Sequence, residues 1–439
     1  MQISELRLHP VAIADGPLRS SYGLHAPYAL RTIVELKTTD GLTGISETYG
    51  GDGPVAALEM AREYIEGMDP FQLTGFRQYL NERAVRDAAV AGGLSQTYLV
   101  PGENPLDQHT RTFAAIEVAC LDVIGKAVGK PLCELVGGRV RDQVPFSAYL
   151  FYKHGGGGGL GGDIREDEYG EALDPPAIVR QARQMIVKYG FREIKLKGGV
   201  LDPDVEVATI GALREEFGEA YPLRIDPNCA WSVETSVKIG DLLQAELSGA
   251  GYLEDPTATL NGMAEVRRRL LAKGIKTPLA SNVAVVSFEQ AVKAKSVDAV
   301  QIVLSDPHYW GGIRNQQRLS FLCQILGLGV SMHSNNHLGV SMMIMAHAGA
   351  VSEHLTHACD THYPWQSAQD EVVLGGRVPM VDGNVEVSRT RPGIGVELDY
   401  DQLARGRERY QRLPYRKRDD EAEMRKHVDP GWRRVLPRW

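Results

Sequence analysis

The sequence predicts an α/β protein in which a small α+β domain precedes a (β/α)8-type barrel. Two observations lead to this fold class. From about residue 144 onward, short apolar runs alternate with helical stretches, which is typical of βαβ units in a parallel sheet. The final polar residues of successive runs lie 24 to 29 residues apart. This spacing is close to the roughly 30 residues that a strand, a helix and two loops require.

Residues 1–140 lack this repeat and predict the α+β domain. Alternating apolar residues over Ile3–Val11 indicate a first strand. Two further apolar runs, Leu30–Leu36 and Leu42–Glu47, flank the dipeptide Asp40-Gly41. Because Asp-Gly between two apolar runs is a hairpin signal, these runs are expected to pair as neighbouring strands.

Eight apolar runs are the predicted strands of the barrel domain, residues 141–395. They are Val144–Tyr152, Glu193–Lys197, Leu223–Asp226, Tyr252–Asp255, Pro278–Asn282, Ala299–Asp306, Val330–His333 and His357–His362. In such barrels the carboxyl ends of the strands and the loops that follow them form the active-site face. The polar residues that end these runs are therefore expected to point into one mouth: Lys197, Asp226, Glu254, Asn282, Asp306, His333 and His362.

Three segments lie outside the strand repeat. Residues 54–138 follow helical spacing and are expected to stop at Gly129-Lys130-Pro131. The run HGGGGGLGGD at 154–163 lacks the GK[ST] ending of a phosphate loop, so we expect a flexible loop after the first barrel strand. Residues 396–439 are highly charged and are expected to form a tail that packs on the first domain.

The charge balance excludes several classes of partner. The chain has 48 Lys and Arg against 56 Asp and Glu, a formal net charge of −8, whereas nucleic acids and anionic membranes bind a basic face. No apolar run approaches the ~20 residues that span a bilayer, and the amino terminus has no signal region. We therefore expect a soluble cytoplasmic protein. Its five cysteines show no CxxC spacing and indicate reduced, buried thiols: Cys120, Cys133, Cys229, Cys323 and Cys359.

Asp226, Glu254 and Asn282 end three successive predicted strands, in IDPN, LEDP and LASN. Three oxygen donors at neighbouring strand ends suit a hard cation such as Mg2+, which takes few protein ligands and leaves positions open for substrate. The two carboxylates balance a divalent charge. The alternative is that each residue only caps the following helix. Their recurrence at one period favours metal binding.

Lys195 and Lys197 lie in IKLK. Residues two apart in a strand share one face, so both ammonium groups are expected to point into the barrel. The alternative is the solvated face of an edge strand, but a closed barrel has no free edge. Like charges depress each other's pKa, and a nearby cation adds to this effect. A lysine kept partly neutral can act as a base.

Asp306 and His333 end two neighbouring runs. A carboxylate behind an imidazole fixes its tautomer and stabilises the imidazolium. A lone buried histidine is more often a hydrogen-bonded core residue, and that interpretation is kept for His337, His347, His354 and His357. His333 differs because it begins the polar cluster HSNNH directly after an apolar strand.

A metal between a lysine and a histidine suits proton abstraction α to a carboxylate. Removing that proton adds negative charge to an anion, and a cation and a lysine beside the carboxylate stabilise the resulting enediolate. Loss of a β-hydroxyl then gives dehydration, whereas return of the proton to the other face gives epimerisation. Two alternatives are a Schiff-base aldolase and a catalytically silent barrel. Neither has a reason to keep the Asp, Glu and Asn set.

The sequence resembles the enolase superfamily, and within it the glucarate dehydratases, over nearly the full chain. The motifs that carry the resemblance are GLHAPY (23–28), YLFY (149–152), IKLKGG (194–199), RIDPNCAW (224–231), EDP (254–256), ASN (280–282), SDPHYW (305–310), MHSNNH (332–337), DTHYPWQ (360–366) and RDD (418–420). Asn282 is the most telling residue, since other branches usually place Glu or Asp there. The segment Pro101–Thr112 departs from the family pattern, which has a threonine in this loop. Whether Thr110, Thr112 or neither replaces it stays open.

The resemblance implies a (β/α)7β barrel with a capping domain built from both termini, and Mg2+ on Asp226, Glu254 and Asn282. It implies two bases, Lys197 and the His333–Asp306 dyad. With D-glucarate, His333 would take the C5 proton and protonate the departing C4 hydroxyl, giving 5-keto-4-deoxy-D-glucarate, while Lys197 would serve the C5 epimer. Another hexarate, galactarate or L-idarate, is the alternative substrate, and a homo-oligomer is favoured. The implied substrate contacts are His25, Tyr149, Lys195, Asn228, Ser334, Asn335, His362 and Arg418.

Overall fold

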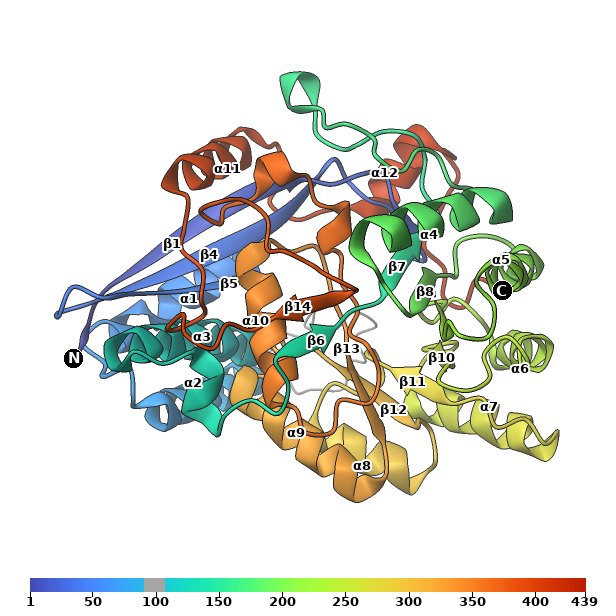
Figure 1. The fold of residues 1–439 in the computed structure, drawn as a ribbon, viewed down its shortest axis with the longest axis horizontal. Helices are drawn as coiled ribbons and strands as arrows, with labels where there is room; N and C mark the ends of the chain where they lie inside the picture. Colours follow the sequence, from blue (N-terminus) through green and yellow to red (C-terminus); the bar gives the residue numbers. More distant parts are fainter. Residues whose placement is uncertain (91–106) are drawn as a thin grey trace.

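The computed structural model describes residues 1–90 and 107–439. A parallel sheet is curled into a barrel with helices on its outside, and an antiparallel sheet lies beside it (Figure 1). Seven barrel strands are each followed by one helix, and an eighth extended segment completes the ring. The predicted α/β fold, a (β/α)7β barrel with an α+β capping domain, is therefore confirmed. The two termini lie at opposite ends of the molecule.

The capping domain is built on an antiparallel sheet of three strands in the order β1-β4-β5. Its strands are β1 (Ile3–Ala14), β4 (Tyr28–Thr38) and β5 (Thr43–Tyr49). Strands β4 and β5 form the hairpin predicted at Asp40-Gly41, where Gly41 has a φ of 82°. Helix α3 ends at Val128, directly before the predicted stop signal. The helices of this domain are α1 (Asp52–Ile65), α2 (Leu73–Val90) and α3 (Asp107–Val128), followed by a short 3-10 turn, η1 (Leu132–Val136).

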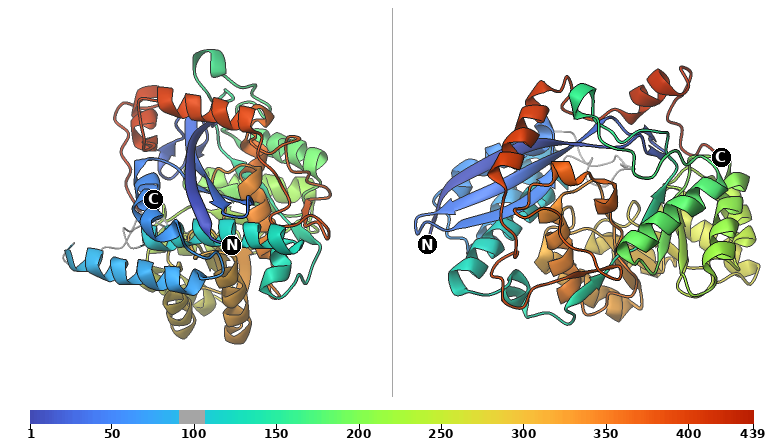
Figure 2. Two further views of the ribbon diagram at one scale, coloured as in Figure 1. Left: turned by 90° about the vertical axis from the view of Figure 1, so that its left-hand side faces the viewer. Right: turned by 45° about the horizontal axis from the view of Figure 1, so that its top comes forward.

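The sheet is covered on both faces because successive side chains of a strand alternate. Ile13 and Ile33 belong to the main core, and helices α1 and α3 contact this sheet. On the opposite face, Ala12 and Ala14 pack with Tyr410 of α11 (Tyr400–Arg412). Figure 2 shows the sheet between α11 and the N-terminal helices.

The tail of residues 396–439 contacts more than the capping domain. Helix α12 (Asp420–His427) lies against β3 (Gly23–Leu24). The last residue, Trp439, reaches the barrel: its N–H donates to Ala230 O at 3.0 Å, and its carbonyl accepts from Ser232 N at 2.6 Å. The tail thus bridges the capping domain and the barrel.

The barrel sheet is wholly parallel, with its strands hydrogen-bonded in sequence order. Its strands are β7 (Ala148–Phe151), β8 (Ile194–Lys197), β9 (Leu223–Asp226), β10 (Tyr252–Glu254), β11 (Leu279–Ser281), β12 (Ile302–Ser305) and β13 (Gly329–Met332). The helices that follow them are α4 (Pro175–Tyr189), α5 (Pro203–Phe217), α6 (Val233–Leu242), α7 (Leu260–Ala272), α8 (Phe288–Ser296), α9 (Ile313–Leu326) and α10 (Gly339–Val351). The remaining elements are β2 (Arg19–Ser20), β6 (Gln143–Pro145), β14 (Asn384–Glu386), η2 (Gly161–Asp163), η3 (Tyr363–Trp365) and η4 (Ala368–Asp370).

Local sequence signals account for where the barrel helices begin and end. Asp174 precedes α4 and its side chain accepts from Ala177 N at 2.8 Å, while Pro175 occupies the first helical position. Gly190 ends α4 in the left-handed conformation, at a φ of 72°.

Within the described part of the chain, no helix is long and apolar enough to cross a membrane.

The prediction of a regular eighth strand at His357–His362 is wrong. This segment makes only a few ladder hydrogen bonds. Cys359 N donates to Pro145 O at 2.9 Å, and Asp360 N donates to Met332 O at 2.8 Å. It therefore joins β13 to the residues before β7 and closes the ring. The first predicted strand, Val144–Tyr152, is likewise interrupted, because Phe146 N donates to Gly383 O instead of to a barrel neighbour.

The glycine run was expected to be a flexible loop, and the structure places it in a loop of which the central part packs closely against neighbouring backbone. A Cβ on Gly158 would lie 2.2 Å from Asp15 O, and one on Gly157 would lie 2.2 Å from Arg165 O. Gly159 N donates to Pro27 O at 2.9 Å. The glycines are there because only a residue without a side chain lets backbones approach so closely. Gly157, Gly158 and Gly159 thus form a packed strap, called the glycine strap, beside the loop that carries His25.

Replacing Gly158 by alanine is expected to destabilise the protein by about 3 kcal/mol, because a left-handed φ of 84° and a backbone clash add together. Gly161 is a matched control. Its φ is 58°, but a Cβ there would meet nothing within 4 Å, so Gly161→Ala should lose only about 1 kcal/mol. Urea unfolding measures both losses. Equal losses would show that the strap is not packed as described.

Candidate active site

Six of the predicted site residues meet at the carboxyl end of the barrel strands. Lys197, Asp226 and Glu254 are the last residues of β8, β9 and β10. The other three, Asn282, Asp306 and His333, directly follow β11, β12 and β13. All six are less than one-tenth exposed. Because the strands are parallel, their carboxyl ends lie at one mouth, as the periodicity predicted.

The two lysines contact carboxylates inside the mouth. Lys195 Nζ lies 2.6 Å from Glu254 Oε2, 2.6 Å from Asp360 Oδ2 and 3.6 Å from Asp226 Oδ2. Lys197 Nζ donates to Asp226 Oδ2 at 2.6 Å and to Asn228 Oδ1 at 3.0 Å. Both side chains therefore point into the barrel, and neither lies on a solvated face.

The expected depression of the lysine pKa is wrong for Lys195. Burial lowers the pKa of this ammonium group, but Asp360 and Glu254 outweigh burial and raise the pKa well above its usual value. The reason is that each nearby carboxylate stabilises the charged form. Lys195 is thus a fixed positive charge and not a base.

The mouth holds more negative than positive charge. Four carboxyl groups lie around two ammonium groups: Asp226, Glu254, Asp255 and Asp360 around Lys195 and Lys197. Burial, reinforced by Asp226 and Asp360, raises the pKa of Glu254 well above its usual value. The charged form of Glu254 is therefore opposed by its surroundings, and a divalent ion beside it would relieve this repulsion, so the donor set fits such an ion.

Asn282 completes the predicted metal set. With its amide nitrogen turned to the carboxylates, Asn282 donates to Asp255 Oδ2 at 2.9 Å and to Glu254 Oε1 at 3.2 Å, and its oxygen lies 3.3 Å from His333 Nε2. The opposite orientation puts the amide oxygen against the two carboxylates, which only an intervening cation stabilises. The amide position is therefore compatible with a metal ligand.

Asp255 holds the backbone of Asn282 in place. Its Oδ2 accepts from Asn282 N at 2.8 Å and from Val283 N at 3.1 Å, and its Oδ1 accepts from Ser281 Oγ at 2.5 Å. Burial raises the pKa of Asp255 to about 6, although these hydrogen bonds lower it. Within residues 1–90 and 107–439, no three His, Cys, Asp or Glu side chains form a metal-type cluster. The predicted metal ligands do not form such a cluster, because their third donor is the amide of Asn282.

The His333–Asp306 pair is present and has a third member. His333 Nδ1 lies 3.3 Å from Asp306 Oδ2, whereas His308 Nδ1 lies only 2.5 Å from Asp306 Oδ1. Although burial opposes it, His308 and then His333 lower the pKa of Asp306 far below its usual range. The carboxylate is therefore ionised and accepts from both imidazoles.

A second charged group lies toward the capping domain, around Asp15. His25 Nδ1 and Arg418 Nη1 each lie 3.0 Å from Asp15 Oδ2, and Asn336 Nδ2 donates to Asp15 Oδ1 at 3.0 Å. Burial lowers the pKa of Arg418, but Asp420 and Asp15 outweigh it and raise this pKa. Asp15 is fully buried and orients two of the predicted substrate contacts.

The other predicted substrate contacts surround the barrel end. Tyr149 donates its hydroxyl to Asp226 Oδ2 at 3.4 Å, and its ring lies 5.0 Å from that of His362. His362 N donates to Ser334 Oγ at 3.1 Å, and Asn335 Nδ2 donates to Tyr49 Oη at 3.4 Å. Burial lowers the pKa of His362 well below its usual value, so this imidazole is neutral.

The segment Pro101–Thr112 lies partly outside the described residues. Thr110 and Thr112 are on helix α3, and Thr112 donates its hydroxyl to Gln108 O at 2.9 Å within that helix. A Cβ on Gly311 would lie 3.3 Å from Thr110 Cγ2. Of the two, Thr110 is thus the one shown beside the loop that follows β12.

Sequence reasoning missed four residues of this mouth: Asp15, Asp255, His308 and Asp360. Three of them stand inside quoted motifs, namely EDP, SDPHYW and DTHYPWQ, so their positions were visible although their roles were not. Asp15 lies between the predicted strand Ile3–Val11 and the motif GLHAPY. No local signal marks it, because its partner Arg418 lies 403 residues away.

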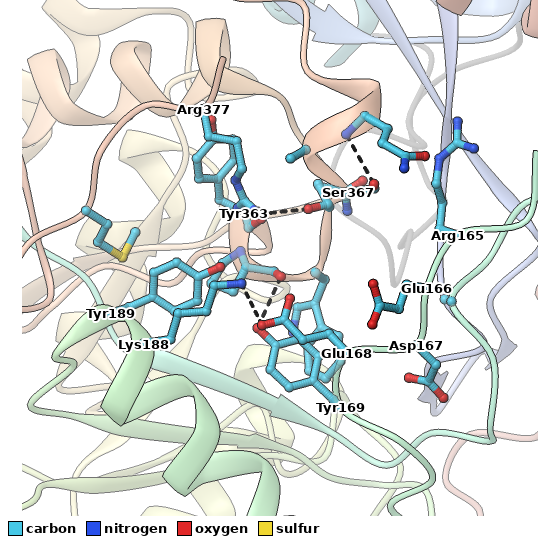
Figure 3. A pocket seen from close by; sticks show the side chains of 18 of the residues that line it. Arg165, Glu166, Asp167, Glu168, Tyr169, Lys188, Tyr189, Tyr363, Ser367 and Arg377 are labelled. Atoms are coloured by element: carbon cyan, nitrogen blue, oxygen red, sulfur yellow. Dashed lines mark hydrogen bonds and ion pairs between the residues drawn. The ribbon is translucent and has the colours of Figure 1, made fainter. Parts of the chain in front are cut away.

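A separate pocket of about 680 Å³ lies between the glycine strap, the end of α4 and the segment after η3 (Figure 3). Its basic side chains already have partners: Arg165 Nη2 donates to Asp370 Oδ1 at 2.6 Å, and Lys188 Nζ donates to Glu168 Oε1 at 2.5 Å. None of the predicted site residues lines this pocket. The candidate active site is therefore the barrel mouth and not this pocket.

Comparison with known proteins defines the class of this fold and site. Residues 177–403 match the family described as enolase C-terminal domain-like. The chain belongs to the enolase superfamily. Over its whole length it is 43% identical to a probable glucarate dehydratase of Streptomyces coelicolor, covering 99% of that protein.

Two solved structures are similar over the whole chain. An enolase from Pseudomonas fluorescens, with bound magnesium, potassium and tartrate, is 43% identical, with a TM-score of 0.92 and 99% of that chain covered. An enolase from Thermobispora bispora, complexed with magnesium and formate, is 44% identical, with a TM-score of 0.88 and 100% covered. The likeness thus includes the capping domain and the tail as well as the barrel.

Proposed function

We propose that the protein is a Mg2+-dependent acid-sugar dehydratase that converts D-glucarate to 5-keto-4-deoxy-D-glucarate and water. One observation carries the proposal. Lys197 on β8 and His333 after β13 stand at opposite sides of a mouth that also holds two carboxylates and an amide. Two bases facing a cation site suit proton abstraction α to a carboxylate. The likeness to a probable glucarate dehydratase supports the substrate class.

Asp226, Glu254 and Asn282 are the residues that would hold Mg2+, since hard oxygen donors suit this ion. When bound, the ion supplies positive charge beside the substrate carboxylate, where negative charge develops. The magnesium in the structures from Pseudomonas fluorescens and Thermobispora bispora supports this assignment.

His333 is the proposed base for D-glucarate. Asp306 is ionised and accepts from Nδ1, so Nε2 is the nitrogen left to take the C5 proton. The electron pair of the C5–H bond moves into an enediolate, which Lys195 stabilises with its fixed positive charge. The pair then forms the C4–C5 double bond as the C4 hydroxyl leaves, and the proton on His333 completes the water. The enol product tautomerises to the 5-keto acid.

Lys197 would serve the epimeric substrate, because it faces the opposite side of the mouth. His25 and Arg418 would bind the distal carboxylate, and Tyr149, Asn228, Ser334, Asn335 and His362 would hold the hydroxyl groups. A charged guanidinium beside a buried acid suits a second carboxylate. The tartrate in the Pseudomonas fluorescens structure, a hydroxylated diacid, supports a diacid substrate. We also propose that the protein is cytoplasmic and a homo-oligomer.

The test is α-keto acid formation with Mg2+ from D-glucarate, L-idarate, galactarate and mono-acid sugars, with an EDTA control. We expect metal-dependent product from D-glucarate. Product from another diacid alone would keep the mechanism and change the substrate. Mg2+ binding without product from any acid sugar would overturn the dehydratase assignment.

A further inference from the structure

The Asp306 carboxylate is held from two sides. On one side, its Oδ1 accepts from His308 N at 2.8 Å and from His308 Nδ1 at 2.5 Å. On the other side, its Oδ2 lies 3.3 Å from His333 Nδ1 and accepts from Tyr49 Oη at 3.4 Å. The shortest of these contacts belong to His308, a residue with no role in the proposed reaction so far.

We propose that His308 is a positioning residue for proton abstraction: it binds Asp306 Oδ1 so that Oδ2 stays aligned with His333. The inference rests on the proposed function and deepens it. A carboxylate bonded only to His333 could turn about its Cβ–Cγ bond. The two contacts from His308 fix that rotation, and with it the direction of the imidazole that Asp306 holds.

The other end of His308 is anchored to the capping domain. Its Nε2 lies 2.8 Å from Ser341 Oγ on α10, and Ser341 N donates to Glu47 Oε2 at 2.9 Å. Glu47 and Tyr49 are two residues apart on β5 and share one face. One strand of the capping domain therefore contacts Asp306 directly, through Tyr49, and supports His308 through Ser341.

The chemistry of the contact suggests the variants. Asparagine places its amide nitrogen near the position of imidazole Nδ1, so His308→Asn keeps a donor to Asp306. Glutamine places its nitrogen near Nε2, so His308→Gln removes that donor while keeping polarity and size. His347→Gln is the matched control, because His347 is a buried histidine on α10 that contacts Cys133 N and Ile394 O outside the site.

The readout is exchange of the C5 proton in D2O, followed by NMR, for D-glucarate and its C5 epimer L-idarate. His308→Gln is expected to slow exchange and turnover of D-glucarate about 30-fold, with KM changed less than about threefold. Exchange of L-idarate through Lys197 should change by less than about threefold, since His308 does not touch that side. His308→Asn should recover D-glucarate exchange to within about fivefold of the unmodified protein.

Three results would overturn the inference. Unchanged D-glucarate exchange in His308→Gln would show that the His308 imidazole does not position Asp306. Equal losses for both epimers would show that His308 only supports the fold, a possibility that the thermal midpoint checks independently. An unmodified protein that exchanges neither epimer would overturn the proposed function itself. Ser341→Ala keeps the His308 imidazole but removes its second contact. It should slow exchange of D-glucarate about threefold and leave exchange of L-idarate unchanged.

Discussion

His333→Asn is expected to lower kcat for D-glucarate at least about a thousandfold, which is ~4 kcal/mol of activation free energy. Asparagine keeps a donor toward Asp306 but has no group that can accept the C5 proton. The enediolate then cannot form from the His333 side. Steady-state assay of keto-acid production measures the loss.

Lys197 supplies an internal control for this variant. Exchange of the C5 proton of L-idarate should persist in His333→Asn and be lost in Lys197→Met, because each base serves one face of the substrate. Mg2+ binding and the thermal midpoint should stay near those of the unmodified protein. Retained dehydration of D-glucarate in His333→Asn would mean that another group is the base.

Glu254→Gln is expected to weaken Mg2+ binding more than about 100-fold and to abolish turnover. Loss of a residue that only hydrogen-bonds to a metal ligand costs roughly 10- to 100-fold in affinity, and Glu254 is proposed to be a ligand itself. The substitution removes one of the two carboxylates of the ligand set. The metal-free fold should tolerate it, because burial raises the pKa of Glu254 and so disfavours its charged form, and glutamine is a neutral side chain of the same shape. Titration calorimetry with Mg2+ measures the affinity.

Thermal unfolding with and without Mg2+ gives a second measurement. A ligand that binds only the folded state stabilises it, so the midpoint of the unmodified protein should rise with Mg2+ and that of Glu254→Gln should not. Glu386→Gln is the charge-matched control, since Glu386 is exposed on β14. Equal Mg2+ affinity in Glu254→Gln and in the control would contradict the ligand assignment.

The strand-end residues were predictable because a barrel repeats one local pattern. Each βαβ unit returns the chain to the same end of the sheet, so polar residues that end apolar runs must share a mouth. Asp226, Glu254 and Asn282 needed only this argument. The prediction of an eighth strand failed for the same reason, because His357–His362 follows the period but makes only some of the ladder hydrogen bonds.

The glycine run shows what composition alone does not predict. Composition alone reads HGGGGGLGGD as a flexible loop, since glycine has the widest conformational freedom. The same lack of a side chain also permits the closest backbone contacts, and Gly158 uses it against Asp15 O. Composition cannot distinguish these two uses, because the difference lies in what the loop packs against.

The sequence by itself determined the barrel class and predicted the candidate metal ligands and the two candidate bases, since these follow from a period of hydrophobicity and from side-chain type. Only the tertiary structure decided their partners. Asp360 meets Lys195 across 165 residues, and Arg418 meets Asp15 across 403. His308 stands two residues from Asp306, yet its second contact is Ser341 on α10. Such contacts depend on how elements pack in space, and no local pattern records that packing.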